Sequence, residues 1–261
     1  MTDDLPGPWD SLRRLTAARI GLKRSGASLA TAPLLEFQLA HARARDAVHE
    51  ALDEAALQRD LAPLGLPVLT VASLANDRPQ FLMRPDLGRQ LSSDAEQALA
   101  AMKGAYNIGF VISDGLSARA AQKHAALLLA EIIPALKDWR IAPLVIVRHG
   151  RVGAGDAVAA ALGATCVVIL LGERPGLTAP DSLGAYLTWK PRPDTSEAER
   201  NCVSNIRPEG VRYADAARTI AHLLRAMRTG GVSGIALKDD SDRLLLTAET
   251  TTTPTPPPRS E

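Results

Sequence analysis

Two charged residues, Glu173 and Arg174, directly follow an apolar run in the stretch CVVILLGERPGL, residues 166–177. The run is rich in β-branched residues, which is typical of a strand buried on both faces. In open α/β sheets, ligands bind beyond the carboxyl ends of the strands. Glu173 is therefore a candidate acceptor for a bound ligand. The alternative is a solvated ion pair between Glu173 and Arg174.

Polar loops follow two other predicted strands. The loop SDGLSA spans residues 113–118, and the loop HGRVGAGD spans residues 149–156. Because the carboxyl ends of parallel strands share one edge of a sheet, we expect these loops to meet the GERPGL loop there. Ser117 can cap the following helix, so a capped turn is the alternative to a binding role. The polar stretch ERNCVSNIRPEG, 199–210, has no clear periodicity and indicates a loop.

Other chemical motifs are weak or absent from the sequence. A dinucleotide site needs three spaced glycines, but GAGDAV has only Gly153 and Gly155, with Val158 in the third place. No Walker loop, Gly-x-Ser-x-Gly elbow or zinc spacing occurs. His41 and His49 lie two turns apart on a predicted helix, where packing is favoured over ligand binding. Spacing alone therefore predicts a ligand-binding α/β domain and names no reaction.

The composition argues against several classes of protein. The net charge is +1 over 261 residues, which provides no general attraction to nucleic acid. No apolar run reaches the ~18 residues of a membrane span, so we expect a soluble cytosolic protein. Two cysteines, Cys166 and Cys202, cannot build a disulfide framework, and Cys166 is expected in the core. Aromatic residues make up only 3%, so the core must consist mainly of aliphatic side chains.

Predicted strands and helices alternate along most of the chain. The strands are PVLTVAS (67–73), NIGFVIS (107–113), APLVIVR (142–148), TCVVILLG (165–172) and, as a candidate last strand, GVSGIALK (231–238). The helices span about 31–61, 86–103, 117–136, 156–163 and 214–228. Such alternation predicts βαβ units and a mostly parallel sheet. The expected fold class is α/β, with a Rossmann-like domain preceded by a helical N-terminal region.

The domain organisation follows from these elements. We expect a helical N-terminal region with a basic arm over 1–75, the Rossmann-like domain over 76–246, and a disordered tail over 247–261. The basic arm, SLRRLTAARIGLKRSG, is too short for a domain. The tail is poor in apolar residues and rich in Thr and Pro. Thr31 is expected to cap the first long helix, with Pro33 in its first turn.

Several long blocks of this sequence resemble, in order, the small (light) subunit of ethanolamine ammonia-lyase. The blocks are DLPGPWDSLRRLTAARIGLKRSGASLAT, LEFQLAHARARDAVH, RPDLGRQL, VISDGLSA, HGRVGAGD, GERPGLTAPDSLGAYLTW, ERNCVSNIRPEG and GIALKDD. The resemblance covers about Pro8 to Asp240. It implies an assembly of six small and six large subunits, in which a TIM-barrel large subunit binds ethanolamine. With adenosylcobalamin, the assembly converts ethanolamine to acetaldehyde and ammonia by a radical mechanism.

The resemblance also implies what this chain contributes. Cobalamin would lie between the two subunits and contact Val152, Glu173 and Cys202. Neither a catalytic residue nor a metal ligand is implied in this chain, which would be inactive alone. Some cobalamin proteins replace the lower base on cobalt with the His of Asp-x-His-x-x-Gly. Here His149 is followed at once by Gly150, which agrees with a family that keeps the nucleotide base on cobalt.

Some expectations stay open at this point. The resemblance implies a cytoplasmic enzyme with no nucleic-acid or membrane partner. Some family members enter a bacterial microcompartment through a long N-terminal extension, whereas here the similarity begins almost at the first residue, so encapsulation is undecided. One alternative is a stand-alone Rossmann-like nucleotide-binding enzyme or regulator, supported only by GAGDAV. Another is a purely structural partner protein, in which changes at Glu173 would leave cofactor affinity unaffected.

Overall fold

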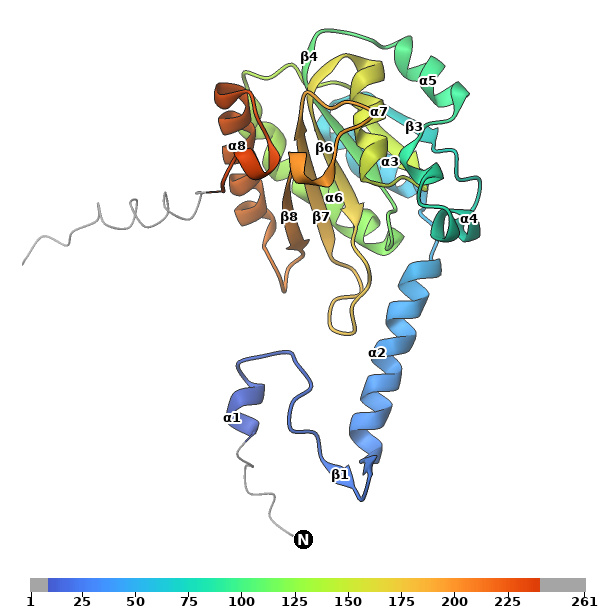
Figure 1. Cartoon of the computed structure of the whole chain (residues 1–261), viewed down its shortest axis with the longest axis vertical. Coiled ribbons are helices and arrows are strands. Elements are labelled where there is room, and N and C mark those ends of the chain that lie inside the picture. Colours follow the sequence, from blue (N-terminus) through green and yellow to red (C-terminus); the bar gives the residue numbers. More distant parts are fainter. Residues whose placement is uncertain (1–8, 240–261) are drawn as a thin grey trace, which may run out of the picture.

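The computed structural model describes residues 9–239 and contains a six-stranded sheet in the order β3-β5-β4-β6-β7-β8 (Figure 1). The strands are β3 (Val68–Ala72), β4 (Tyr106–Ser113), β5 (Leu144–Arg148), β6 (Ala164–Gly172), β7 (Leu183–Trp189) and β8 (Arg200–Ile206). The first four strands in this order are mutually parallel, β7 pairs with β6 in antiparallel fashion, and β8 pairs with β7 in antiparallel fashion. The α/β class with a mostly parallel sheet is thus confirmed. The predicted tail, 247–261, lies outside the described residues.

Helices surround the sheet and extend from it. The α-helices are α1 (Asp10–Arg13), α2 (Thr31–His49), α3 (Glu54–Leu61), α4 (Arg78–Met83), α5 (Ser93–Ala100), α6 (Ala118–Ile132), α7 (Val152–Leu162) and α8 (Tyr213–Gly230). Short 3-10 turns are η1 (Ala62–Leu64), η2 (Leu87–Arg89), η3 (Ile133–Leu136), η4 (Glu197–Glu199) and η5 (Gly234–Ala236). Helices α3, α6 and α8 contribute to one hydrophobic cluster, and α5 and α7 contribute to the other.

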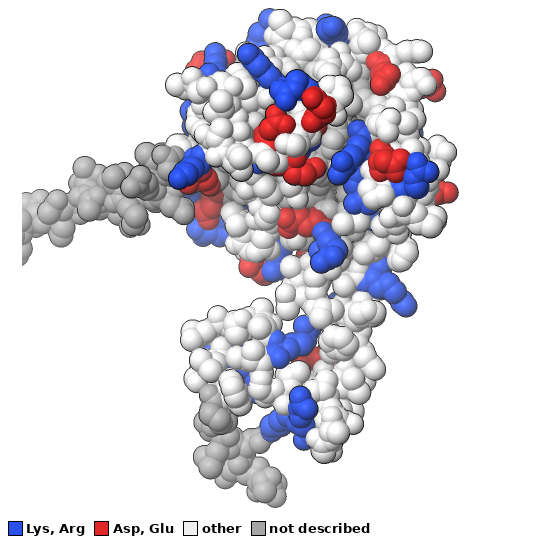
Figure 2. Space-filling view, in the orientation of Figure 1, with Lys and Arg blue, Asp and Glu red and all other residues white. Residues whose placement is uncertain are grey.

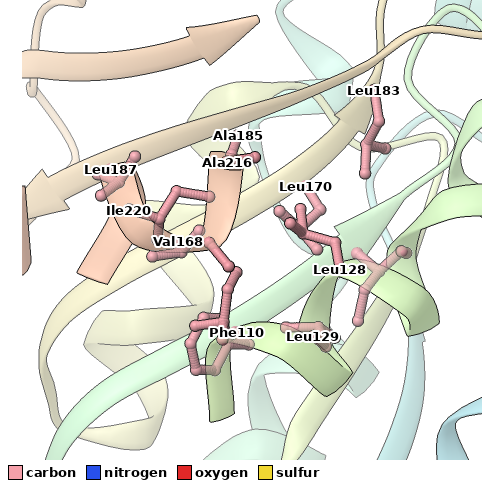
Figure 3. Close-up of a cluster of buried hydrophobic side chains, with 14 of the residues drawn as sticks. Phe110, Leu128, Leu129, Val168, Leu170, Leu183, Ala185, Leu187, Ala216 and Ile220 are labelled. Carbon is pink, nitrogen blue, oxygen red and sulfur yellow. The ribbon is translucent and has the colours of Figure 1, made fainter. Parts of the chain in front are cut away.

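The central strands are predominantly apolar because both of their faces are covered. In β4, Phe110 and Ile112 belong to the cluster with α6 and α8, whereas Val111 belongs to the cluster with α7. Successive side chains of a strand point to opposite faces, so a strand covered on both sides has no alternation of apolar and polar positions. Figure 3 shows the first cluster, where Phe110 lies near Val168 and Leu128 lies near Leu170. This double coverage explains why β4, β5 and β6 were recognisable in the sequence.

Several predicted elements differ from the structure. The helix expected over 31–61 is divided into α2 and α3, because Glu50 is extended and Asp53 caps α3 by accepting the Ala56 N–H at 2.9 Å. Thr31 is already the first helical residue, so its predicted capping role is wrong. The helix expected over 86–103 is α-helical only in α5, which Ser92 caps at 3.2 Å from Ala95 N.

The C-terminal part of the sheet was predicted incorrectly. GVSGIALK forms the turn η5, where Asn201 Oδ1 accepts the Gly234 N–H at 2.7 Å, and adds no strand. Residues 199–210, predicted as a loop, contain the edge strand β8, whose polar side chains obscure the pattern because only Val203 and Ile206 are buried. Strand β7 was not predicted at all.

The N-terminal region projects from the body of the protein. Figure 1 shows α2 extending away from the sheet, with α1 and the two-stranded ribbon β1 (Arg24–Ser25) and β2 (Ser28–Leu29) beyond it. Ala47 is the one buried residue of α2. Strand β3 lies within 1–75 by number, yet it forms an edge of the main sheet. None of the helices in residues 9–239 is long and apolar enough to span a membrane.

Candidate functional site

The loops that follow β4, β5 and β6 meet around one cavity of ≈450 Å³, as expected from a parallel sheet. The lining residues are Gly115, Leu116, Gly150, Arg151, Val152, Leu171, Gly172, Glu173, Arg174 and Tyr186. Two of the three predicted contact residues, Val152 and Glu173, are among them. The third, Cys202, lies next to the cavity, opposite Tyr186 in the β7–β8 register.

Glycines allow the three loops to approach one another closely. Gly115 has a φ of +53°, and a Cβ there would stand 2.5 Å from Gly172 O. A Cβ on Gly172 would overlap Ser117 O. Only glycine fits at these two positions, because a side chain would collide with the backbone of the neighbouring loop. The loops therefore pack backbone against backbone at the base of the cavity. Ser117 occupies the N-cap position of α6 but makes no capping bond; its hydroxyl donates to Pro180 O at 3.0 Å.

The carboxylate of Glu173 is held at one oxygen. Oε2 accepts the Ser182 hydroxyl at 2.6 Å and the Asn205 backbone N–H at 3.1 Å. Within residues 9–239, Oε1 receives no hydrogen bond and Glu173 makes no ion pair with Arg174. The ion-pair alternative is therefore not realised there. Glu173 presents a fixed carboxylate with one oxygen available to a donor.

Tyr186 and Cys202 form the side of the site that β7 and β8 supply. Burial, followed by the neighbouring Cys202, raises the pKa of the Tyr186 phenol, so this group stays protonated. Cys202 is exposed, and its Sγ lies 3.2 Å from Ser204 Oγ. Desolvation raises the pKa of the Cys202 thiol, and the negative charge of Glu173 raises it further. Cys202 is thus a neutral thiol beside the carboxylate.

Val152 begins α7 and is presented by a well-fixed turn. The preceding residue, Arg151, lies with its guanidinium 4.2 Å from the centre of the Phe81 ring and donates to Phe81 O at 3.1 Å. Its backbone N–H donates to Gly88 O at 2.6 Å. These contacts come from α4 and the segment after it, which had no predicted role in the site.

The GAGDAV segment has a packing role. Both of its glycines lie inside α7, and a Cβ on Gly155 would stand 3.0 Å from Ile169 Cβ in the sheet. Gly153 faces Arg89, with a Cβ 3.2 Å from Arg89 Cβ. Gly155 therefore brings the helix close to β6, Gly153 brings it close to Arg89, and neither belongs to a loop over a phosphate. This leaves the nucleotide-binding alternative without its one supporting motif.

A buried ion pair links the two sides of the site. Arg200 in β8 pairs with Asp156 in α7 through Nη1–Oδ1 and Nη2–Oδ2 distances of 2.8 and 2.7 Å. Each side chain is 4% exposed. Arg200 also donates to Thr188 Oγ1 at 3.0 Å. This ion pair thereby links β8, which contains Cys202, to α7, which begins at Val152.

Some residues of the site were missed in the sequence. Tyr186 lies on β7, whose pattern LGAYLTW alternates only in part, and Arg151 is held by contacts far away in the chain. In the described part of the chain, no three His, Cys, Asp or Glu residues are grouped so that they could hold a metal ion. The arrangement suits a large ligand that offers hydrogen-bond donors and apolar surface.

Comparison with known proteins identifies the relatives of the chain. The family model "Ethanolamine ammonia-lyase light chain (EutC)" matches residues 6–238. A protein of Ralstonia nicotianae named ethanolamine ammonia-lyase small subunit is 50% identical over 258 residues, covering 94% of this chain and 95% of the relative. One of the same name from Azotobacter vinelandii is 48% identical over 252 residues, covering 93% of each. A third, from Rhodopseudomonas palustris, is 50% identical over 233 residues, covering 88% and 89%.

Proposed function

Since this chain belongs to the family of ethanolamine ammonia-lyase light chains, we propose that it supplies one wall of an adenosylcobalamin site shared with a large catalytic subunit. The carboxylate of Glu173 lines the cavity, and within residues 9–239 its hydrogen bonds go to Oε2 and leave Oε1 available; this is the observation that carries the proposal. A carboxylate in this state is a strong acceptor for an N–H donor.

The lining residues fit the chemistry of a corrinoid. Its rim carries amide side chains, whose N–H groups need acceptors, and its ring system offers apolar surface. Glu173 supplies the acceptor, while Val152 and the ring of Tyr186 supply apolar contacts. Cys202, a polarizable and neutral thiol, can pack beside them. Val152, Glu173 and Cys202 thus form a mixed surface of the kind that the cofactor requires.

The size of the cavity supports a shared site. Cavities of about 300–1,000 Å³ enclose most of a drug-sized ligand. Cobalamin is much larger than such ligands, so a space of ≈450 Å³ holds only one part of it. The remaining surface of the cofactor then needs a second chain. The names of the relatives, all small subunits, agree with a larger partner.

The residues of this chain bind and orient the cofactor in this proposal. When bound, adenosylcobalamin supplies the radical chemistry that converts ethanolamine to acetaldehyde and ammonia. Glu173 accepts a hydrogen bond, and the packed loops exclude water from one side. We do not assign His149 the role of the lower base on cobalt, because Gly150 follows it directly and the Asp-x-His-x-x-Gly spacing is absent from the sequence. The residues that bind ethanolamine belong to the partner.

The projecting N-terminal region is the proposed docking surface for the large subunit. Helix α2 exposes Leu35 and Leu39, at 59% and 52%, and Leu15 in the basic arm is 82% exposed. Apolar side chains that gather on a helix with almost no buried residue mark an interaction surface. Figure 2 shows Lys and Arg side chains on this projecting part. The expected assembly contains six small and six large subunits.

Co-expression with the large subunit tests the proposal. We expect acetaldehyde release from ethanolamine only from the assembled pair. In the pair, Glu173→Gln should weaken equilibrium binding of adenosylcobalamin by about tenfold, because a charge-assisted hydrogen bond is roughly twice as strong as a neutral one. Glu131→Gln, an exposed change in α6, is the matched control. Unchanged affinity in an active Glu173→Gln pair would refute the role of Glu173, and a well-assembled pair without activity would refute the function.

A further inference from the structure

Arg78, the first residue of α4, donates hydrogen bonds to two separate segments of the chain. Its Nε donates to Val48 O in the last turn of α2 at 2.7 Å. Its Nη1 donates to Gly115 O at 2.7 Å and to Asp114 Oδ2 at 3.1 Å. The guanidinium carbon lies 4.8 Å from the centre of the Phe81 ring. Arg78 therefore joins the end of the projecting helix to the loop after β4.

Asp114 extends this network to the loop after β5. Its Oδ1 accepts the backbone N–H of His149 at 2.8 Å and lies 3.0 Å from Ser113 Oγ. His149 has a φ of +54°, a left-handed conformation that is unusual for a residue other than glycine. Such a conformation persists only where neighbouring contacts impose it. The Asp114 carboxylate supplies one of these contacts, and Ser73, whose hydroxyl donates to His149 O at 2.9 Å, supplies another.

The pair lies behind the cavity and does not line it. The Asp114 and Arg78 side chains are 6% and 13% exposed. Yet Gly115, bound to Arg78, and Gly150, the neighbour of His149, both line the cavity. The network thus connects the loop of Gly115 with the loop of Gly150, which leads to Val152.

A buried ion pair of this kind is not needed for stability alone. Apolar side chains of similar volume often replace such pairs without loss of stability. Burial raises the pKa of Asp114 and lowers that of Arg78, because the pair has little access to water. Apolar residues would not supply directional hydrogen bonds. A guanidinium does, because it donates in a fixed plane to several acceptors at once. Here these acceptors belong to α2 and to the cavity loop.

We propose that Arg78 and Asp114 are positioning residues of the cofactor site: without touching the cofactor, they hold the loops of Gly115 and Val152 at the correct separation and fasten both to the end of α2. This inference rests on the proposed function and extends it, because α2 is the proposed docking helix. The ion pair would then connect the surface that meets the partner with the surface that meets the cofactor.

The test uses the assembled complex of both subunits. Equilibrium binding of adenosylcobalamin is measured by ultrafiltration and visible absorbance for Arg78→Gln, Arg78→Lys and Asp114→Asn. The matched control is Arg84→Gln. It removes an exposed ion pair next to the same helix, in which Arg84 Nη2 lies 2.6 Å from Asp86 Oδ2. We expect Arg78→Gln and Asp114→Asn to weaken adenosylcobalamin binding by about tenfold to a hundredfold. An effect of this size is typical of residues that orient a ligand-contacting group. Arg78→Lys should recover part of the affinity, because it keeps the charge but cannot reach all three acceptors.

Two further readouts separate positioning from a general structural role. With saturating adenosylcobalamin, kcat and the KM for ethanolamine should stay within about twofold of the parent. A structural role alone would reduce the yield of assembled complex and leave the affinity of the assembled fraction unchanged, and that result would overturn the proposal. Asp114→Asn, which keeps the shape and an acceptor for His149, secures the test if Arg78→Gln fails to fold.

The binding measurements distinguish an error in the positioning role from an error in the proposed function. If the parent complex binds adenosylcobalamin and Glu173→Gln weakens this binding, while Asp114→Asn and Arg78→Lys bind like the parent, only the positioning role is wrong. If the parent complex binds no adenosylcobalamin, the proposed function is wrong and the positioning role is overturned with it.

Discussion

The carboxylate of Glu173 lies against a glycine: a Cβ on Gly184 would stand 3.1 Å from Glu173 Oε1 and 3.2 Å from its Cγ. The same Cβ would stand 3.2 Å from Tyr186 Cε2. Gly184 belongs to β7, which runs antiparallel to β6, the strand that ends at Gly172 immediately before Glu173. The absence of a side chain at position 184 therefore makes room for two residues of the proposed cofactor wall.

Gly184→Ala should displace Glu173 or Tyr186 and weaken adenosylcobalamin binding by the complex about tenfold, because small displacements of a binding group are costly. The free energy of unfolding should change by less than about 2 kcal/mol, since crowding and reduced backbone entropy oppose each other. Equilibrium binding and urea unfolding measure the two effects. Gly176→Ala is the control, because its nearest contact would be 3.7 Å away. Equal affinities in both variants would contradict the assignment of Glu173.

Acid should destabilise the small subunit through His124. This residue is 5% exposed, and its Nδ1 lies 2.7 Å from the Tyr213 hydroxyl. Burial lowers the pKa of His124 below its ordinary value of 6.5, although Asp181 opposes this shift. Below pH 6.5 the unfolded chain therefore binds a proton that the folded chain rejects. Stability should fall as the pH drops from 6.5 to the folded pKa, by at most about 1.4 kcal/mol per pH unit from this group.

Urea unfolding at pH 7 and pH 5.5 measures this loss. His124→Gln should show a smaller loss of unfolding free energy between the two pH values than the parent. His41→Gln, a change on the exposed surface of α2, should behave like the parent. An equal loss in the parent and in His124→Gln would show that other groups control the acid response.

The two thiols should react very differently. Cys166 is fully buried, its Sγ lies 3.2 Å from Asn107 O, and burial raises its pKa to about 12. Cys202 is exposed, so maleimide should label one thiol in the native chain and two in urea. In the complex, adenosylcobalamin should protect Cys202 from labelling if that residue contacts the cofactor. Mass spectrometry identifies the labelled peptide, and labelling unaffected by the cofactor would remove Cys202 from the proposed site.

Polar substitutions on α2 should impair assembly and spare the fold. Leu35 and Leu39 lie one helical turn apart and are both more than half exposed. The double variant Leu35→Ser with Leu39→Ser should unfold within about 0.5 kcal/mol of the parent, because it removes little buried surface. Its copurification with the large subunit should fall several-fold, as expected where exposed apolar residues form an interface.

Leu127→Ser is the control for this surface. Leu127 is 52% exposed on α6 and lies beside Pro63 and Leu64, which are not part of α2, so its substitution should leave copurification unchanged. Deletion of the basic arm, Arg13 to Arg24, is expected to impair assembly as well. Assembly at the parental level in the double variant or the arm deletion would show that the corresponding segment is not a docking surface.

The centre of the fold was predictable because burial leaves a clear pattern. Strands β4, β5 and β6 are covered on both faces, and their apolar runs end at the residues where the loops of the site begin. The convergence of those loops then follows from parallel pairing alone. Val152 and Glu173, which were expected to contact the cofactor, accordingly lie at one cavity.

The remaining parts depend on contacts between distant residues. Strand β8 has only two buried side chains, so its pattern resembles that of a loop. The break after α2 follows from a local cap at Asp53 within a continuous helical pattern. Arg78 could not be linked to the site at all, because its acceptors lie 30, 36 and 37 residues away in the chain. Long-range polar contacts of this kind leave no periodic signal.

The pair formed by Arg200 and Asp156 has a consequence for the speed at which the site becomes competent. Because β8 and α7 are fastened to each other in the folded small subunit, the wall that carries Val152 and Cys202 is already arranged before any cofactor arrives. A preorganised wall adds little ordering entropy to the binding step. In the proposed assembly, the wall of this chain would therefore need no rearrangement between β8 and α7 when the cofactor binds, which favours rapid capture once the partner chain is in place.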